Sequence, residues 1–330
     1  MNVFSYNPAT MQKYHFDWKI TLLFWLMRRT PPPSEAHLKQ IRAHPEASPP
    51  ALLYRRYPLE SVENRAIPGQ GGSIPIRIYR PVRDERRPVI VFFHGGGWVL
   101  GSLGSHDAIC RRLAFENRVM VVAVDYRLAP EHPFPAAVED AYDATGWVAQ
   151  NAPGLGADPQ RLIVMGDSAG GNLAAVVSQA ARDLAGPPIA AQVLVYPVVD
   201  MVGRYPSKEQ YPDTPVLTSE TMAYFSRQYL PRPADARDPR VSPLLASDLS
   251  RLPPALILTA EYDPLRDEGQ AYADRLRAAG VEVKHTCVPR MPHGFLSFGR
   301  LASGEDAAYA WIRQGLYECE PLLRRQRTKK

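Results

Sequence analysis

The stretch LIVMGDSAGG, residues 162–171, decides the fold of this chain. Its four apolar residues predict a buried strand, and the residues that follow, 172–177, have a helical pattern. Gly166 and Gly170 flank Ser168 as in the Gly-x-Ser-x-Gly turn, which joins a strand to a helix and exposes the serine hydroxyl. So sharp a turn needs small neighbours. The stretch therefore predicts Ser168 as a nucleophile, although the motif alone also fits a glycine-rich helix start with a serine N-cap.

Length and composition indicate one large globular unit. Of the 330 residues, 45% are hydrophobic and 22% charged, which is ordinary for a globular protein. The net charge of +5 arises from 39 basic and 34 acidic residues that are interspersed, without the basic stripe typical of nucleic-acid binding. We therefore expect no nucleic-acid partner, and we interpret the basic run at 324–330 as a solvated terminus.

Cysteine usage and the N-terminal segment give expectations about the cellular compartment in which the protein works. Cys110, Cys287 and Cys319 lie far apart, with neither metal-ligand spacing nor an even count. We therefore expect a reducing, cytoplasmic environment and no metal. The apolar segment 20–27 is too short to span a bilayer, and no cleavage site follows it. We interpret it as a lid or interfacial helix, with attachment to a membrane surface as the less favoured alternative.

Strand and helix patterns alternate along the chain. Isoleucines at positions 74, 76 and 78 predict a half-buried strand that opens the sheet in antiparallel fashion. Further strands are expected at 89–93, 119–124, 162–165, 193–196, 255–259 and 281–288. Helices are expected at 106–117, 136–151, 168–184, 265–279 and 303–324. This order predicts an α/β fold with a mostly parallel, doubly wound sheet.

Two regions fall outside this alternation. Residues 1–50 carry weak helical patterns around 11–29 and 34–43, separated by three prolines. Residues 200–252 are rich in proline and contain one clear helix, at 219–230. We assign 1–50 to the N-terminal part of a helical cap and 200–252 to a cap insertion. The catalytic domain then comprises 51–199 and 253–330.

A serine nucleophile needs a base, and the base needs an acid to orient it. On this scaffold the acid and then the histidine follow the serine along the chain. Of the two later histidines, His285 alternates with apolar residues of the strand expected at 281–288 and is interpreted as structural. His293 comes just past the end of that strand and is predicted as the base.

Four carboxylates follow the strand expected at 255–259: Glu261, Asp263, Asp267 and Glu268. We favour Asp263 as the acid because it precedes Pro264 at a strand-to-helix junction. The last two carboxylates fall in the first helical turn, where they meet the helix dipole favourably. A helix N-cap is the structural alternative for Asp263.

The sequence HGGGW, residues 94–98, directly follows the strand expected at 89–93. Acyl transfer builds negative charge on a carbonyl oxygen, and glycine N–H groups can approach it unobstructed. We therefore predict an oxyanion hole from Gly95, Gly96, Gly97 and Ala169. A phosphate cradle is the rival interpretation, but the phosphate-binding glycine motifs do not occur here. His94 is assigned to shaping the loop.

Five ordered motifs resemble the hormone-sensitive-lipase-like branch of the α/β-hydrolases, the bacterial family IV carboxylesterases. They are HGGGWV (94–99), DYRLAPE (125–131), GDSAGG (166–171), DPLRDEG (263–269) and HGF (293–295). The resemblance covers about 70–315 and implies the α/β-hydrolase fold, a helical cap and a Ser168, Asp263 and His293 triad. It further implies that Gly96, Gly97 and Ala169 donate the oxyanion hole and that 126–135 is structural. It is weakest in 1–60 and 200–250, which shape substrate choice.

The expected protein is a serine carboxylesterase that forms an acyl-enzyme and needs no metal or cofactor; its partner is a small-molecule ester. An amidase or deacetylase with the same triad, and a non-catalytic ligand-binding protein on the same scaffold, remain open. Because Trp18 and residues 22–26 are strongly apolar, we expect 1–45 to pack on Met222, Tyr224 and Phe225 as a lid. Such a lid favours short- to medium-chain esters. The last strand, with an unpaired edge, predicts a homodimer.

Overall fold

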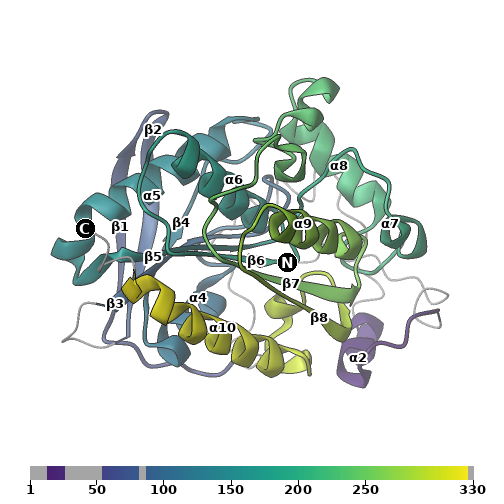
Figure 1. The fold of residues 1–330 in the computed structure, drawn as a ribbon. Coiled ribbons are helices and arrows are strands. Elements are labelled where there is room, and N and C mark those ends of the chain that lie inside the picture. Colours follow the sequence, from purple (N-terminus) through teal and green to yellow (C-terminus); the bar gives the residue numbers. More distant parts are fainter. Residues whose placement is uncertain (1–12, 27–53, 82–86, 326–330) are drawn as a thin grey trace.

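A computed structural model describes residues 13–26, 54–81 and 87–325. Its middle layer is an eight-stranded sheet in the order β1-β2-β4-β3-β5-β6-β7-β8 (Figure 1). The strands are β1 (Ser61–Gly69), β2 (Gly72–Arg80), β3 (Arg87–Phe93), β4 (Met120–Val124), β5 (Ala157–Asp167), β6 (Ala191–Val195), β7 (Ala255–Tyr262) and β8 (Val283–Pro292). Strands β3 to β8 run parallel, whereas β2 is antiparallel to β1 and β4. The expected mostly parallel sheet with an antiparallel opening is confirmed.

Helices cover both faces of the sheet (Figure 1). One face carries α5 (Ala136–Leu155), α6 (Ala169–Asp183) and α9 (Arg266–Ala278). The other carries α2 (Trp18–Leu26), α4 (Asp107–Asn117) and α10 (Glu305–Arg325). The sheet is therefore doubly wound, as expected, with a hydrophobic core on either side.

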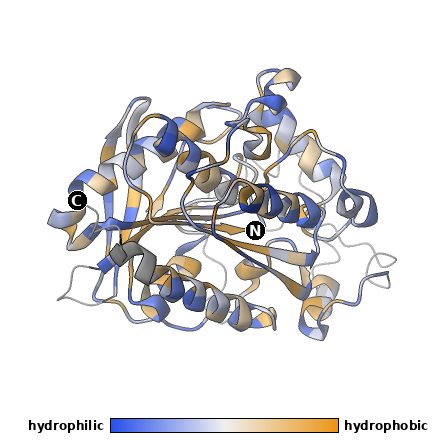
Figure 2. Ribbon diagram, viewed as in Figure 1, coloured by the Kyte–Doolittle hydropathy of each residue, from blue (hydrophilic) through white to orange (hydrophobic). Residues whose placement is uncertain are grey.

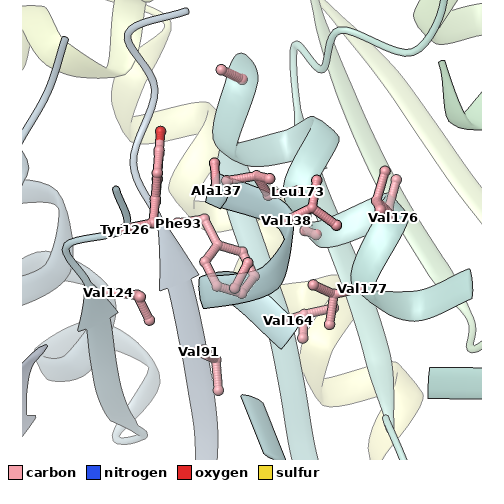
Figure 3. Close-up of a cluster of buried hydrophobic side chains, with 14 of the residues drawn as sticks. Val91, Phe93, Val124, Tyr126, Ala137, Val138, Val164, Leu173, Val176 and Val177 are labelled. Carbon is pink, nitrogen blue, oxygen red and sulfur yellow. The ribbon is translucent and has the colours of Figure 1, made fainter. Parts of the chain in front are cut away.

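Alternate residues of each central strand enter opposite cores. In β3, Val89, Val91 and Phe93 join one buried cluster, and Ile90 and Phe92 join the other. This explains why central strands are continuous apolar runs, and Figure 2 shows hydrophobic residues concentrated in the sheet. Figure 3 shows part of the first cluster, between the sheet and helices α5 and α6. Each large side chain buried there contributes about 1.5–3 kcal/mol relative to an exposed position.

The chain between β6 and β7 includes residues 200–252, whose assignment to a cap insertion stays a prediction. It contains the helices α7 (Pro206–Gln210) and α8 (Ser219–Tyr229) and the 3₁₀ turns η2 (Pro233–Arg237) and η3 (Pro243–Leu245). The helix expected at 219–230 is confirmed. Thr218 caps α8, because its side chain accepts a hydrogen bond from the N–H of Thr221 at 3.0 Å.

The N-terminal helix α2 lies within the pattern expected at 11–29, and the second pattern, at 34–43, lies outside the described residues. Ile20 and Phe24 of α2 are buried, and Phe24 packs edge-on against Phe298 in the turn η4 (Phe295–Leu301). None of the helices in the described ranges is long and apolar enough to cross a membrane.

The described part of this segment, residues 13–26, contacts the region 200–252 at Asp213 rather than at the expected Met222, Tyr224 and Phe225. Tyr14 donates to Asp213 Oδ1 at 2.7 Å, and Phe16 packs on Tyr262 at a ring-centroid distance of 5.1 Å. Figure 1 shows α2 beside β8 and well apart from α8, which carries Met222, Tyr224 and Phe225. Phe24 of α2 packs on Phe298 in the middle of η4, and Phe16, which precedes the helix, packs on Tyr262 at the end of β7.

Candidate active site

Ser168 lies on the turn between β5 and α6, with φ 54° and ψ −117°. A residue held in so sparsely populated a region costs about 1–3 kcal/mol. A Cβ atom at Gly166 would lie 2.3 Å from the carbonyl carbon of Gly170, and one at Gly170 would lie 1.9 Å from the carbonyl oxygen of Phe93. Both positions therefore require glycine, and the tight turn leaves Ser168 half-buried at the carboxyl end of β5.

The imidazole of His293 bridges Ser168 and Asp263. Its Nε2 lies 2.9 Å from Ser168 Oγ, and its Nδ1 lies 2.7 Å from Asp263 Oδ2. Asp263 is fully buried, and its Oδ1 accepts the N–H of Leu265 at 2.8 Å. The three predicted residues follow β5, β7 and β8, so parallel strands deliver them to one end of the sheet. In this geometry a base can take the serine proton while a carboxylate orients the base.

The other carboxylates considered for the acid have different partners. Each accepts a backbone N–H from another segment: Asp267 from Ser207 (2.8 Å), Glu261 from Arg290 (2.7 Å) and Glu268 from Val199 (2.8 Å). The pKa of Glu268 lies above its ordinary value, because the effect of burial exceeds the opposing effect of its ion pair with Lys208 at 2.7 Å. Asp263 is therefore the carboxylate that contacts His293. His285 is half-buried, with its Nε2 3.1 Å from Thr259 Oγ1, in keeping with a structural role.

The loop HGGGW (94–98), which we call the glycine loop, enters the site from β3. Its residues Gly96, Gly97 and Trp98 have φ values of 120°, 61° and 59°. Leu100 donates its N–H to the Gly96 carbonyl at 2.9 Å, which closes the loop into a turn. Within the described part of the chain, no hydrogen bond engages the N–H groups of Gly96, Gly97 or Ala169. These three donors fit the predicted oxyanion hole.

Gly95 departs from the prediction. Its N–H donates to Asp167 Oδ1 at 3.0 Å, and His106 Nε2 lies 3.3 Å from the same oxygen. Because this N–H already has a partner, the assignment of Gly95 to the oxyanion hole is wrong. The position still needs glycine, since a Cβ atom would lie 2.5 Å from Asp167 Oδ2. Gly95 anchors the glycine loop to the nucleophile turn.

His94, the first residue of the glycine loop, is held in place by contacts with its neighbours. Its Nδ1 lies 2.9 Å from the Gly95 carbonyl oxygen, and its ring stacks on Tyr126 with centroids 4.3 Å apart. The Tyr126 hydroxyl donates to the His94 carbonyl at 2.7 Å. Burial and the neighbouring His106 lower the pKa of His94 to about 3, so its ring is neutral near neutral pH. The expected loop-shaping role of His94 agrees with these contacts.

Comparison with known proteins assigns the chain to a family. A family described as "alpha/beta hydrolase fold" matches residues 90–297, which is more than half of the sequence. The match includes the glycine loop, Ser168, Asp263 and His293. The chain belongs to the α/β-hydrolase family. The fold predicted from the five motifs is thereby confirmed.

Several relatives have names that describe ester hydrolysis. The carboxylic ester hydrolase LipN of Mycobacterium tuberculosis is 46% identical over 280 residues, covering 83% of this chain and 72% of LipN. The ethyl acetate hydrolase of Pseudomonas putida is 43% identical over 254 residues, covering 75% of this chain and 79% of its own. A solved hyperthermophilic esterase from the archaeon Pyrobaculum calidifontis matches with a TM-score of 0.84 and 44% identity, covering 94% and 98% of the two chains. The predicted resemblance to carboxylesterases is confirmed.

Two further residues of this α/β-hydrolase site escaped the sequence analysis. Tyr196 follows β6 at φ 35°, is buried, and places its ring 4.8 Å from that of His293. Its position directly after a parallel strand is a signal that could have identified it. His106 offers no such signal. Its contact with Asp167 joins the start of α4 to the end of β5, which are far apart in sequence.

Helix α8 of the α/β-hydrolase contacts the glycine loop directly. A Cβ atom at Gly97 would lie 2.3 Å from the ring of Phe225. The rings of Trp98 and Tyr229 stack with centroids 4.2 Å and planes 5° apart. An element of the expected cap insertion therefore rests on the loop that carries the proposed oxyanion donors.

Proposed function

We propose that this α/β-hydrolase cleaves carboxylic esters of short to medium acyl chain through an acyl-enzyme on Ser168. One observation carries the proposal: His293 lies within hydrogen-bond distance of both Ser168 (2.9 Å) and Asp263 (2.7 Å). The ester-hydrolase names of the relatives support it independently. Ser168 acts as nucleophile, His293 as general base and acid, and Asp263 as the group that orients the imidazole.

In the first half-reaction, Ser168 Oγ attacks the ester carbonyl carbon while its proton passes to His293 Nε2. The electron pair of the carbonyl moves to its oxygen, and this oxyanion accepts hydrogen bonds from the N–H groups of Gly96, Gly97 and Ala169. When the tetrahedral species collapses, the ester C–O bond breaks and the alcohol leaves with the proton from His293. Water then attacks the acyl-enzyme by the same steps and releases the carboxylic acid.

An amidase or deacetylase would use the same side chains, and a binding protein would use the scaffold without turnover. The purified full-length chain should be offered matched aryl esters and anilides of increasing acyl length. We expect ester turnover that declines beyond medium chains, much slower amide turnover, and no ester turnover with Ser168→Ala. Equal rates on matched esters and amides, or hydrolysis that survives Ser168→Ala, would contradict the proposal.

A second proposal concerns assembly. β8 is the last strand in the sheet order, and in the described part of the chain no strand pairs with its outer side. An unpaired edge is a template for a second strand, so we propose a homodimer that joins two copies along β8. Light scattering at working concentration should give twice the chain mass. A single-chain mass would contradict the dimer.

A further inference from the structure

We infer that helix α8 clamps the glycine loop in the conformation that presents the Gly96 and Gly97 N–H groups. In this arrangement Tyr229 is a positioning residue that acts through Trp98. The inference rests on the proposed esterase function and adds to it a structural role for the insertion. The insertion would then support the site through its contacts with the glycine loop.

The glycine loop has a conformation that needs external support. Its three consecutive residues Gly96, Gly97 and Trp98 all have positive φ values, of 120°, 61° and 59°. Glycine adopts such values readily, but a residue with a large side chain does so only where its surroundings hold it. Trp98 is the third of these residues, and it is 2% exposed. Its packing partners therefore help to determine the shape of the loop.

Trp98 is held at both its ring and its backbone. The ring stacks face to face with that of fully buried Tyr229, at 4.2 Å and 5°. The Trp98 carbonyl accepts the N–H of Ala129 at 2.8 Å. The carbonyl is thus tied to the segment after β4, whereas the ring depends on α8.

Tyr229 is itself fixed against the catalytic domain. Its carbonyl accepts the N–H of Phe134 at 2.9 Å, and the Phe134 ring meets its ring edge-on at 5.9 Å. One helical turn earlier, Phe225 lies against Gly97. Residues four apart on a helix share a face, so a single face of α8 contacts two successive residues of the loop. Movement of α8 would therefore release both contacts together.

The contact depends on ring faces rather than on polar atoms. The Tyr229 hydroxyl and Trp98 Nε1 are buried and have no hydrogen-bond partner among the described residues. Removing the hydroxyl should therefore leave the stack intact. This makes Tyr229→Phe the conservative variant and Tyr229→Leu the variant that removes the stack.

Steady-state kinetics on a short-chain aryl ester should separate the two variants. We expect Tyr229→Leu to lower kcat about 10- to 100-fold with little change in KM, somewhat less than the roughly 10²- to 10³-fold cost of losing one oxyanion donor. Tyr229→Phe, which keeps the aromatic ring, should have a kcat close to that of the unmodified chain. Arg227→Ala, which changes an exposed residue of the same helix, is the matched control.

Amide hydrogen exchange tests the clamp without relying on catalysis. The N–H groups of Val99 and Leu100 both donate to the Gly96 carbonyl, at 3.1 Å and 2.9 Å, and so report on the closed loop. Their exchange should accelerate in Tyr229→Leu and stay unchanged in Tyr229→Phe. Exchange of Val91, within β3, provides the internal reference.

The outcomes distinguish this inference from the proposed function. If the unmodified chain hydrolyses no ester, the proposed function fails, and the exchange comparison still decides the clamp. If that chain is active and Tyr229→Leu changes only KM, or leaves loop exchange unchanged, the clamp is overturned. Should Tyr229→Leu not fold, as judged by circular dichroism, Phe225→Leu undergoes the same two measurements under the same criteria.

Discussion

The amide N–H of Gly95 donates to the carboxylate of Asp167, 3.0 Å from its Oδ1. This bond ties the loop after β3 to the turn after β5. Burial raises the pKa of Asp167, but nearby His106 and the Gly95 N–H outweigh this effect and hold the pKa below its ordinary value. Asp167 is therefore ionised near neutral pH, and it sets where the glycine loop meets the nucleophile turn.

Replacing Asp167 should separate its role as an acceptor from its charge. Asp167→Asn keeps an oxygen that can accept the Gly95 N–H, so we expect kcat to fall less than about tenfold. Asp167→Leu leaves that N–H buried without a partner, at a cost of about 1–3 kcal/mol, and should lower kcat about 100-fold. Kinetics and thermal unfolding would be measured beside Asp183→Asn, an exposed control. Equal losses in the Asn and Leu variants would show that the charge, and not the acceptor, matters.

Substitutions in the proposed triad should differ in rank. Ser168→Ala or His293→Ala should lower turnover about a millionfold, because triad members act as a unit. Asp263→Asn should cost about ten-thousandfold by disturbing the tautomer of His293. Asp267→Asn is the matched control and should be much milder, since Asp267 bonds Ser207 and Arg266 instead. The measurement is single-substrate kinetics on an aryl ester, and a reversed order of the two Asp variants would refute the choice of acid.

Acid should destabilise the fold through His94. Burial and His106 lower its pKa to about 3 in the folded chain, whereas an unfolded histidine titrates near about 6.5. Between these values the unfolded state binds a proton that the folded state does not, so the free energy of unfolding decreases as pH falls, by up to about 1.4 kcal/mol per unit.

The variant His94→Asn isolates this contribution. Asn keeps a side-chain N–H that can donate to the Gly95 carbonyl but does not titrate. Urea unfolding between about pH 6.5 and 4.5 should therefore give a shallower pH dependence for the variant than for the unmodified chain. Parallel curves would assign the acid sensitivity to other groups.

The lid role of residues 1–45 stays a prediction. Deleting them should broaden the range of acyl lengths hydrolysed, and it should also lower stability because Ile20 and Phe24 are buried. Each of these side chains contributes about 1.5–3 kcal/mol. Trp18 and Trp25 are 68% and 47% exposed, so replacing both with Gln should leave the acyl profile unchanged.

Binding to anionic vesicles, measured on the same variants, tests the membrane alternative. An unchanged acyl profile after deletion, together with vesicle binding that is lost in both variants, would favour surface attachment over a lid.

Much of the fold and the candidate site was predictable because their signals are local. Apolar runs such as 89–93 and the Gly-x-Ser-x-Gly turn depend on residues close together in sequence. His293 and Asp263 were accessible because chain order and the ends of parallel strands limited the candidates. Each of them stands immediately after its strand.

What escaped prediction depends on contacts between distant segments. Gly95, Gly96 and Gly97 are equivalent in sequence, and only the approach of Asp167 from β5 distinguishes the first from the others. The apolar pattern around Phe24 predicts burial but does not specify a partner, and the partner turned out to be η4 rather than α8. Tyr229 and Trp98 are 131 positions apart, so no local pattern could pair them.

The backbone conformation of Ser168, at φ 54° and ψ −117°, links the serine needed for hydrolysis to a cost in thermal stability. Glycine adopts this conformation without the steric penalty that a Cβ atom brings, so Ser168→Gly should unfold at a higher temperature than Ser168→Ala. Because the serine needed for turnover carries the same Cβ penalty as alanine, we expect selection for turnover and for thermal tolerance to oppose each other at this residue. A search for heat-resistant variants conducted without an activity screen would tend to discard the nucleophile.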